Sequence, residues 1–242
     1  MDTLLHHLVD PLNTVLFDFG QDAVSWAELL GFVTGAICVW LTVRVHVWNF
    51  PIGIANNVFF LVLFWTAHLY ADASLQIVYL VLAVMGWWEW LHGGEQRTAR
   101  VIGHATMRHV AVLLVLIVPA TWALYVILSR AHDIAPFWDA LTTALSLAAQ
   151  WLLNLKKFEN WYFWLVADAI YIPLYFVKVL YLTGIVYVLF ISLCLLGLRA
   201  WRAELARSGA AAGGPGADDD VHDAAPAAAP FTAATKPSAT GA

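Results

Sequence analysis

Two indoles, a carboxylate and a phenol share one face of an apolar stretch, ENWYFWLVADAIYIPLYFVK, which runs from residue 159 to residue 178. Steps of three or four residues separate Trp161, Trp164, Asp168 and Tyr171, so on a helix their side chains project from one side. Indoles and a carboxylate together suit a flat cationic ring, held by stacking and by cation–π attraction worth about 0.5–2 kcal/mol per contact. A simpler interpretation is an interfacial tryptophan belt, with the Asp bonded to a neighbouring helix.

Amide side chains form a second polar group within other apolar stretches. Asn56 and Asn57 fall inside the stretch 50–70, and Gln76 lies near the start of the stretch 74–92. An amide both donates and accepts hydrogen bonds, as a ligand carboxamide or sugar hydroxyl requires. Polar groups at membrane depth are costly and are by default candidates for function. The predicted substrate-binding residues are therefore Trp161, Trp164, Asp168, Tyr171, Asn56, Asn57 and Gln76.

Other kinds of chemistry have no visible signature in the sequence. The nine histidines lack metal-ligand spacing, and the two cysteines sit inside apolar runs. The sequence contains no Gly-rich phosphate loop, no GxSxG motif and no HExxH motif. We therefore expect a protein that is not an enzyme, with no metal, no cofactor, no nucleic-acid partner and no ATP-driven step within this chain.

The elements that position these residues must be membrane helices. The chain is 62% hydrophobic and 12% charged, with a mean hydropathy of +0.73, whereas a soluble domain is about half apolar and a quarter charged. Seven apolar stretches approach the roughly 20 residues that cross a bilayer. They lie at 26–45, 50–70, 74–92, 109–129, 137–156, 161–181 and 184–203. The predicted fold is an all-α polytopic membrane protein.

The sequence repeats itself at an offset of 111 residues. This offset aligns 26–90 with 137–201 without a gap, and paired Trp, Asn, Tyr and Gly residues keep one register across three stretches. The predicted architecture is three helices, a linking helix at 109–129 and three more helices inserted in the same orientation. Parallel repeats of this kind place a substrate site near the midplane between the halves. Chance alignment of apolar helices is the alternative.

Basic residues indicate how the chain is oriented in the membrane. In a seven-span topology, Arg and Lys residues at the span ends concentrate on one side, which the positive-inside rule makes cytoplasmic. The N-terminus is then outside. The predicted organisation is an extracytoplasmic segment (1–25), a first three-helix unit (26–92), a cytoplasmic loop with the linking helix (93–136), a second unit (137–203) and a disordered cytoplasmic tail (204–242).

Several motifs resemble the PnuC family of vitamin transporters, whose best-known members carry nicotinamide riboside. The first unit contains WNFPIGIANN (48–57) and GWWEW (86–90), and the second contains ENWYFWLVAD (159–168) and GLRAW (197–201). The resemblance implies a seven-helix fold similar to that of the SWEET sugar transporters. It also implies facilitated diffusion across a bacterial inner membrane, trapping of the vitamin by a cytoplasmic riboside kinase, and a homo-oligomer such as a trimer.

The resemblance also assigns roles to individual positions. Trp161 and Trp164 match aromatics expected at the pyridinium ring, and Asn56 and Gln76 match polar groups expected at the carboxamide or ribose. Position 168 departs from the family pattern, because relatives often have Asn where this chain has Asp168. A carboxylate suits nicotinamide riboside but also thiamine, so transport of another vitamin is an alternative. A seven-helix retinal protein is a second one, disfavoured because the seventh stretch contains no lysine.

Overall fold

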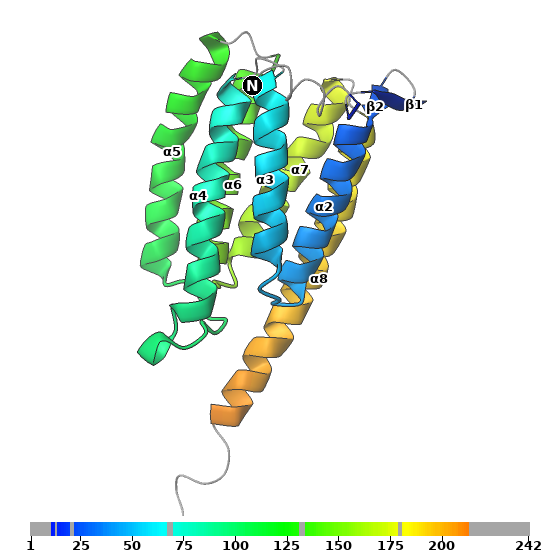
Figure 1. Cartoon of the computed structure of the whole chain (residues 1–242). Coiled ribbons are helices and arrows are strands. Elements are labelled where there is room, and N and C mark those ends of the chain that lie inside the picture. Colours follow the sequence, from blue (N-terminus) through cyan, green and yellow to red (C-terminus); the bar gives the residue numbers. More distant parts are fainter. Residues whose placement is uncertain are drawn as a thin grey trace, which may run out of the picture.

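The computed structural model is a bundle of α-helices with a small two-stranded hairpin near its N-terminal end (Figure 1). It describes residues 11, 12, 14–19, 22–66, 70–130, 134–178 and 181–212. The helices are α2 (Trp26–Val43), α3 (Asn49–Thr66), α4 (Tyr70–His92), α5 (Met107–Arg130), α6 (Pro136–Asn154), α7 (Asn160–Val177) and α8 (Tyr181–Ala212). The strands are β1 (Val15–Phe19) and β2 (Asp22–Ser25), and a short 3₁₀ helix, η1, spans Glu95–Arg97.

The prediction of seven helices is confirmed, and four of them are long and apolar enough to cross a membrane. These four segments are Trp26–Val43, Ala73–His92, Met107–Arg130 and Tyr181–Gly209, while the apolar helix Asn49–Trp65 is shorter. In the described part of the chain, α6 and α7 do not meet this criterion. Both carry polar side chains along their length, and this content lowers their mean hydropathy.

The N-terminal hairpin was not predicted. Strand β1 pairs with β2 in antiparallel fashion, and Ser25 then begins α2 directly. The Ser25 hydroxyl accepts a hydrogen bond from the backbone N–H of Glu28 at 3.2 Å, and the Glu28 carboxylate accepts one from the backbone N–H of Ser25 at 2.9 Å. This reciprocal capping fixes where the first helix starts.

The predicted end of the last helix was wrong. Helix α8 continues to Ala212, so residues 204–212, expected to belong to a disordered tail, are helical. Ala, Leu, Glu and Arg in this segment are strong helix formers, and Arg207 pairs with Glu204 at 2.9 Å along the helix. Figure 1 shows this part of α8 projecting beyond the bundle. The rest of the predicted tail lies outside the described residues.

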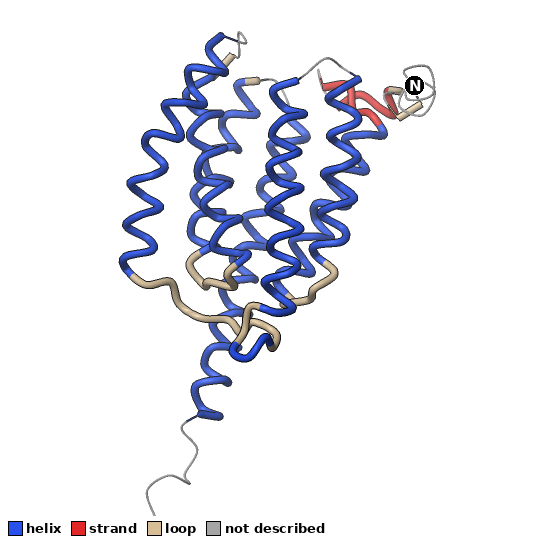
Figure 2. Tube along the Cα trace, turned by 60° about the vertical axis from the view of Figure 1, so that its left-hand side comes forward, coloured by secondary structure: helices blue, strands red, loops and turns tan. Residues whose placement is uncertain are grey.

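Helices from the two predicted units pack on one another. Helix α4 contacts α6, and α8 contacts α2, so the third helix of each unit meets the first helix of the other. Helix α5 packs on α6 and lies at the edge of the bundle in two views (Figure 1, Figure 2). Cross-contacts of this kind mean that neither unit completes its packing alone.

The two units also share a turn conformation. Val45, between α2 and α3, and Lys156, between α6 and α7, are 111 residues apart and have φ of 56° and 47°. The N–H of Val45 donates to the carbonyl of Thr42 at 3.0 Å, and that of Lys156 donates to the carbonyl of Leu153 at 2.8 Å. We call the end of the bundle with these two turns and η1 the η1 end.

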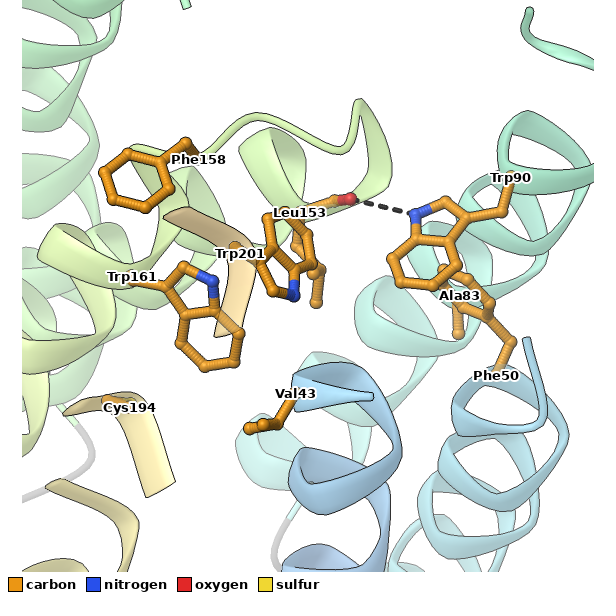
Figure 3. Close-up of a cluster of buried hydrophobic side chains, with 9 residues drawn as sticks. All are labelled: Val43, Phe50, Ala83, Trp90, Leu153, Phe158, Trp161, Cys194 and Trp201. Carbon is orange, nitrogen blue, oxygen red and sulfur yellow. Dashed lines mark hydrogen bonds between the residues drawn. The ribbon is translucent and has the colours of Figure 1, made fainter. Parts of the chain in front are cut away.

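A buried group of aromatic rings joins the units at the η1 end (Figure 3). The indole N–H of Trp90 donates to the carbonyl of Leu153 at 3.0 Å, and that of Trp201 donates to the carbonyl of Thr42 at 3.1 Å. Both donors and both acceptors are 111 residues apart. Each third helix is therefore tied to the last turn of the other unit's first helix by an equivalent bond.

Ring contacts within this group follow the same offset. Phe50 meets Trp90 edge-on, with centroids 5.1 Å apart, and Trp161 meets Trp201 edge-on at 5.5 Å. The ring centroids of Trp90 and Trp201, at the centre of the group, lie 6.3 Å apart. We refer to Phe50, Trp90, Trp161 and Trp201 as the tryptophan cluster.

Candidate substrate-binding site

Trp161, predicted to stack on a ligand, lies in the packed interior. It is 1% exposed, its ring covers Gly197, and it contacts Trp201. Its indole N–H has no hydrogen-bond partner among the described residues. Phe50 occupies the equivalent place against Trp90 in the first unit, so the position serves packing in both units.

Trp164 lies in a different environment. It is half-buried and packs against both buried apolar clusters of the bundle. The equivalent residue in the first unit is Gly53, where an added side-chain carbon would sit 3.4 Å from the Cys38 sulfur. Because the first unit packs without a ring at this position, the Trp164 indole remains a candidate for contact with a ligand.

Asp168 is a buried carboxylate without a cationic partner in the described part of the chain. It is 4% exposed, and the thiol of Cys194 on α8 donates to its Oδ2 at 3.5 Å. Lys178 directly follows the end of the same helix, but its ammonium pairs with Asp139 at 2.7 Å. A carboxylate held inside a membrane protein by one weak thiol donor is an attractive position for a cation.

Three tyrosines stack on one another beside Asp168. Tyr171 and Tyr175, one turn apart on α7, have centroids 5.5 Å apart. Tyr187 of α8 lies 4.7 Å from the first ring and 5.1 Å from the second. Only Tyr171 was predicted as a site residue. The four-residue spacing could have indicated Tyr175, whereas the contact with α8 has no signal in the sequence.

Hydroxyl groups from α4 and α6 complete this polar region. Tyr79 of α4 forms a side-chain hydrogen bond with Ser146 of α6 and lies near Tyr171 and Tyr175. Tyr171 lies against both Ser146 and Thr142. Thr142 is fully buried and Ser146 is 3% exposed. We refer to these residues together with Asp168 and Tyr187 as the tyrosine region, which draws side chains from four helices.

The predicted amides are not brought together with the tyrosine region. Asn56 donates to the hydroxyl of Thr34 and, at 3.4 Å, to the carbonyl of Gly31, both on α2. Asn57 and Gln76 are half-buried. Among the described residues, no hydrogen bond joins any of the three amides to α7. In this conformation the predicted residues therefore form two groups rather than one.

Two open hollows lie away from these groups. One, of about 520 Å³, is at the η1 end, where α8 and the α6–α7 turn meet, and is lined by His104, Phe158, Glu159, Tyr162, Arg202, Leu205 and Ala206. The other, of about 270 Å³, is lined by Leu61, Val62, Trp65 and Ile77. Neither contains a predicted site residue. In this conformation the three tyrosine rings contact one another, which closes the space between them.

Charged residues at the η1 end pair with one another. Arg100 binds Glu89 at 2.6 Å, and Lys156 donates to the carbonyl of Arg100 at 2.7 Å. His104 lies 2.9 Å from Glu159. In the described chain, no group of three or more metal-binding side chains occurs. These pairs stabilise the loop between α4 and α5.

A bundle of apolar helices, four of them long enough to cross a bilayer, is typical of a multi-pass membrane protein. The family model described as nicotinamide mononucleotide transporter matches residues 25–203, and the chain belongs to this family. The protein is accordingly a transporter of the vitamin-carrying PnuC type. The expectation that it is not an enzyme is consistent with this membership.

Individual relatives are distant but cover most of the chain. The nicotinamide riboside transporter PnuC of Escherichia coli is 24% identical over 204 residues, which cover 74% of this chain and 85% of the relative. The riboflavin/roseoflavin transporter RibM of Streptomyces davaonensis is 26% identical over 196 residues, covering 78% and 91%. The crystal structure of the vitamin B3 transporter PnuC matches with a TM-score of 0.58 at 20% identity, over 85% and 88%, and supports the fold.

Proposed function

We propose that the protein takes up nicotinamide riboside by facilitated diffusion across a bacterial inner membrane. The vitamin would be trapped by phosphorylation by a cytoplasmic riboside kinase. The observation that supports this substrate most directly is the buried carboxylate of Asp168, which faces no cation among the described residues and lies beside stacked tyrosines. Nicotinamide riboside carries a permanent positive charge on a flat ring, and both features suit such a region.

The proposed topology has the η1 end in the cytoplasm and the N-terminus outside. Basic residues concentrate at the η1 end, as the positive-inside rule requires. The architecture is a parallel three-plus-one-plus-three repeat with α5 as the linking helix, supported by the equivalent indole bonds of Trp90 and Trp201. We further propose a homo-oligomer such as a trimer, with lipid on the remaining apolar surface.

In this proposal the substrate lies between the two units. Asp168 and Tyr171 bind the pyridinium side together with Trp164, while Asn56, Asn57 and Gln76 approach from the first unit when the interior opens. Trp161 supports this wall from behind. The opening requires the tyrosines to separate, since they stack on one another in the closed conformation.

Another vitamin is the alternative substrate. Thiamine also has a cationic ring, and the relative RibM is named as a carrier of riboflavin, whose ring is neutral. Asp168 favours a cation over riboflavin, because a neutral ring leaves the buried carboxylate without compensation. Nicotinamide riboside and riboflavin share a hydroxyl-rich five-carbon unit, whereas thiamine does not.

Calorimetry on the purified protein with the three vitamins in parallel tests the substrate. The expected order is nicotinamide riboside first, thiamine weaker, and riboflavin weakest. Tighter binding of thiamine or riboflavin would overturn the assignment.

Uptake into proteoliposomes without any ion gradient tests the mechanism, because an absolute requirement for a sodium or proton gradient would exclude facilitated diffusion.

A further inference from the structure

The larger of the two hollows lies at the η1 end, away from the tyrosine region. Its volume is about 520 Å³, and three separate parts of the chain form its walls. His104 comes from the loop before α5, Phe158 and Glu159 come from the α6–α7 turn, and Arg202 and Leu205 come from α8. The lining therefore mixes charged with apolar side chains, and it suits a ligand that has both characters.

The carboxylate in this lining is already bonded within the protein. One oxygen of Glu159 lies 2.9 Å from the Nδ1 of His104, and the other accepts a hydrogen bond from the backbone N–H of Ala105 at 2.6 Å. Both oxygens of Glu159 thus hold the loop before α5 against the start of α7.

The guanidinium of Arg202, by contrast, has no carboxylate partner in the described part of the chain. It lies over the Phe158 ring, 5.9 Å from the ring centroid. Arg207, five residues farther along α8, pairs with Glu204 at 2.9 Å. Arg202 therefore offers an unneutralised cation at the hollow, and a guanidinium binds a carboxylate through two parallel hydrogen bonds.

Other basic residues lie at the same end of the bundle. Arg97 belongs to η1, Arg108 lies near the start of α5, Lys157 lies in the α6–α7 turn, and Arg199 lies on α8. Among the described residues, no carboxylate lies within ion-pair distance of these four side chains. Because complementary charge guides a partner to its surface, the partner of the hollow should be acidic.

The chain itself has an acidic segment close to this hollow in the sequence. Asp218, Asp219 and Asp220 follow the end of α8 by a few positions, and Val221 comes directly after them. Between the helix and this run, the sequence reads Gly-Gly-Pro-Gly (213–216). Such residues favour a reversal of chain direction after a helix. The segment thus offers both the acidic and the apolar side chains that suit the lining.

The chain is long enough for this segment to reach the hollow. Ten residues of helix separate Arg202 from Ala212, which is about 15 Å at the helical rise per residue. Seven further residues lead from Ala212 to Asp219, and they span at most about 24 Å when extended. A chain that reverses after Ala212 therefore returns to the level of Arg202 with length to spare.

We propose that residues 218–221 dock into this hollow within the same chain, with a carboxylate of the run on Arg202 and Val221 against the apolar wall. An exposed ion pair alone is weak. The short tether compensates, because it keeps the segment at an effective concentration on the order of millimolar. The inference does not depend on which vitamin the protein carries.

Fluorescence quenching in the full-length protein tests this contact. Ala217→Cys carries a bimane label next to the acidic run, and Tyr162→Trp places an indole in the lining of the hollow, where it quenches bimane on near contact. Tyr162 is 46% exposed, so the larger ring has room. Labelling without Ala217→Cys reports any reaction at Cys38 and Cys194, and labelled protein without Tyr162→Trp gives the quenching by the native tryptophans.

Arg202→Gln should shift the equilibrium between docked and free segment about two- to fivefold toward the free form, the scale of one exposed ion pair. Arg207→Gln is the matched control and should leave the quenching unchanged, since Arg207 already pairs with Glu204. Substitution of all three aspartates of the run by asparagine should abolish the indole-dependent quenching. Sodium chloride at about 1 M should do the same, because the Debye length is then about 3 Å.

The proposal fails if no indole-dependent quenching occurs at low salt. Equal losses in Arg202→Gln and Arg207→Gln would show general attraction to a basic helix rather than docking in the hollow. Quenching that grows with protein concentration would show that the segment binds a second copy of the chain. Quenching that is lost in phosphatidylglycerol nanodiscs but kept in phosphatidylcholine nanodiscs would show that a lipid headgroup occupies Arg202, and it would overturn the assignment.

Discussion

The tryptophan cluster and the tyrosine region differ in how far the two units resemble each other. In the tryptophan cluster, Trp90 and Trp201 make equivalent hydrogen bonds and equivalent ring contacts. In the tyrosine region, Asp168 replaces Asn57, and Tyr171 and Tyr175 replace Phe60 and Phe64. Where the units match, both copies are needed to pack the bundle, and where they diverge, one copy is free to serve another purpose.

This comparison separates aromatic positions that both units fill with a ring from one that only the second unit fills. The motif ENWYFW contains two indoles that the sequence alone does not distinguish. In the first unit, the equivalent of Trp161 is the aromatic ring of Phe50, whereas the equivalent of Trp164 is Gly53. Position 161 is thus occupied by a packed ring in both units. Only the Trp164 ring is particular to the second unit, and it is the better candidate for a ligand contact.

The largest expected effect is on stability. Trp90→Ala and Trp201→Ala each remove a fully packed indole and its hydrogen bond between units, so each should lower the free energy of unfolding by about 3–5 kcal/mol. Thermal unfolding in detergent measures the loss. Because the two indoles are equivalent, the two losses should agree within about 1 kcal/mol. A severe loss in one variant and none in the other would contradict the structural equivalence of the units.

The next effect is on binding. Asp168→Asn gives the second unit the residue that the first unit has at this position, Asn57. Loss of the carboxylate should weaken nicotinamide riboside by about 10- to 100-fold, since hydrogen bonds and contacts to a charged group are worth about 1.5–3 kcal/mol. Stability should stay the same or rise, because a buried charge is removed. Calorimetry on both proteins measures the affinity.

Riboflavin provides the control for this substitution. Its ring is neutral, so its binding should not weaken in Asp168→Asn and is expected to improve. An equal loss for the charged and the neutral vitamin would show that the carboxylate organises the region rather than attracting a cation.

Much of the fold could be predicted because membrane helices appear in the sequence as long apolar runs. Long apolar runs gave all seven helices. The repeat stays a prediction, and the equivalent hydrogen bonds of Trp90 and Trp201 agree with it. The hairpin was missed because each strand is only four or five residues long. The extension of α8 was missed because alanine-rich sequence occurs both in helices and in unstructured tails. The Leu, Glu and Arg residues between the alanines are what favour a helix here.

Part of the tyrosine region could be predicted from the sequence, and its role as a binding site stays a prediction. Asp168 and Tyr171 share a helix face, which sequence spacing reveals, and both lie in the tyrosine region. Tyr79, Ser146 and Tyr187 come from other helices, and sequence spacing does not show which helices touch. Alignment of the two units at the offset of 111 residues could have identified the hydroxyl-bearing positions. At these positions a serine or tyrosine in one unit aligns with a glycine or phenylalanine in the other. The burial of Trp161 could not be inferred from the sequence. Tryptophan is common at the membrane interface, in binding sites and in packed interiors, so its presence does not tell these environments apart.

A smaller effect concerns a buried lysine in the α6–α7 turn. Lys156 is 7% exposed, its ammonium lies 4.3 Å from the Trp90 ring centroid, and it donates to the carbonyl of Arg100. Burial, with a smaller contribution from Arg100, lowers the pKa of Lys156 to about 8. The unfolded chain therefore binds more protons than the folded chain between pH 8 and the ordinary lysine pKa of about 10.4. Stability should rise with pH across that window.

Lys156→Val tests this by introducing the residue that the first unit has at the equivalent turn, Val45. The variant should be about 1 kcal/mol more stable than the wild type at pH 7, because a buried cation without a carboxylate partner is removed. The difference should shrink as the pH rises above 8, where the folded wild type releases the proton. Unfolding midpoints from pH 7 to pH 10 measure it, and a difference that does not depend on pH would contradict the assignment.

The smallest effect is expected where the comparison predicts that nothing is lost. Trp161→Phe gives the second unit the ring that Phe50 provides in the first, opposite Trp201. The smaller ring loses some packing, but the change also removes an indole N–H that has no hydrogen-bond partner among the described residues. The net change in the free energy of unfolding should stay under about 1 kcal/mol, and riboside affinity should change less than about threefold, whereas Trp164→Ala should weaken binding more strongly. Loss of binding in a stably folded Trp161→Phe variant would place this indole on the ligand, and the rule that matched positions serve packing alone would then fail at its clearest example.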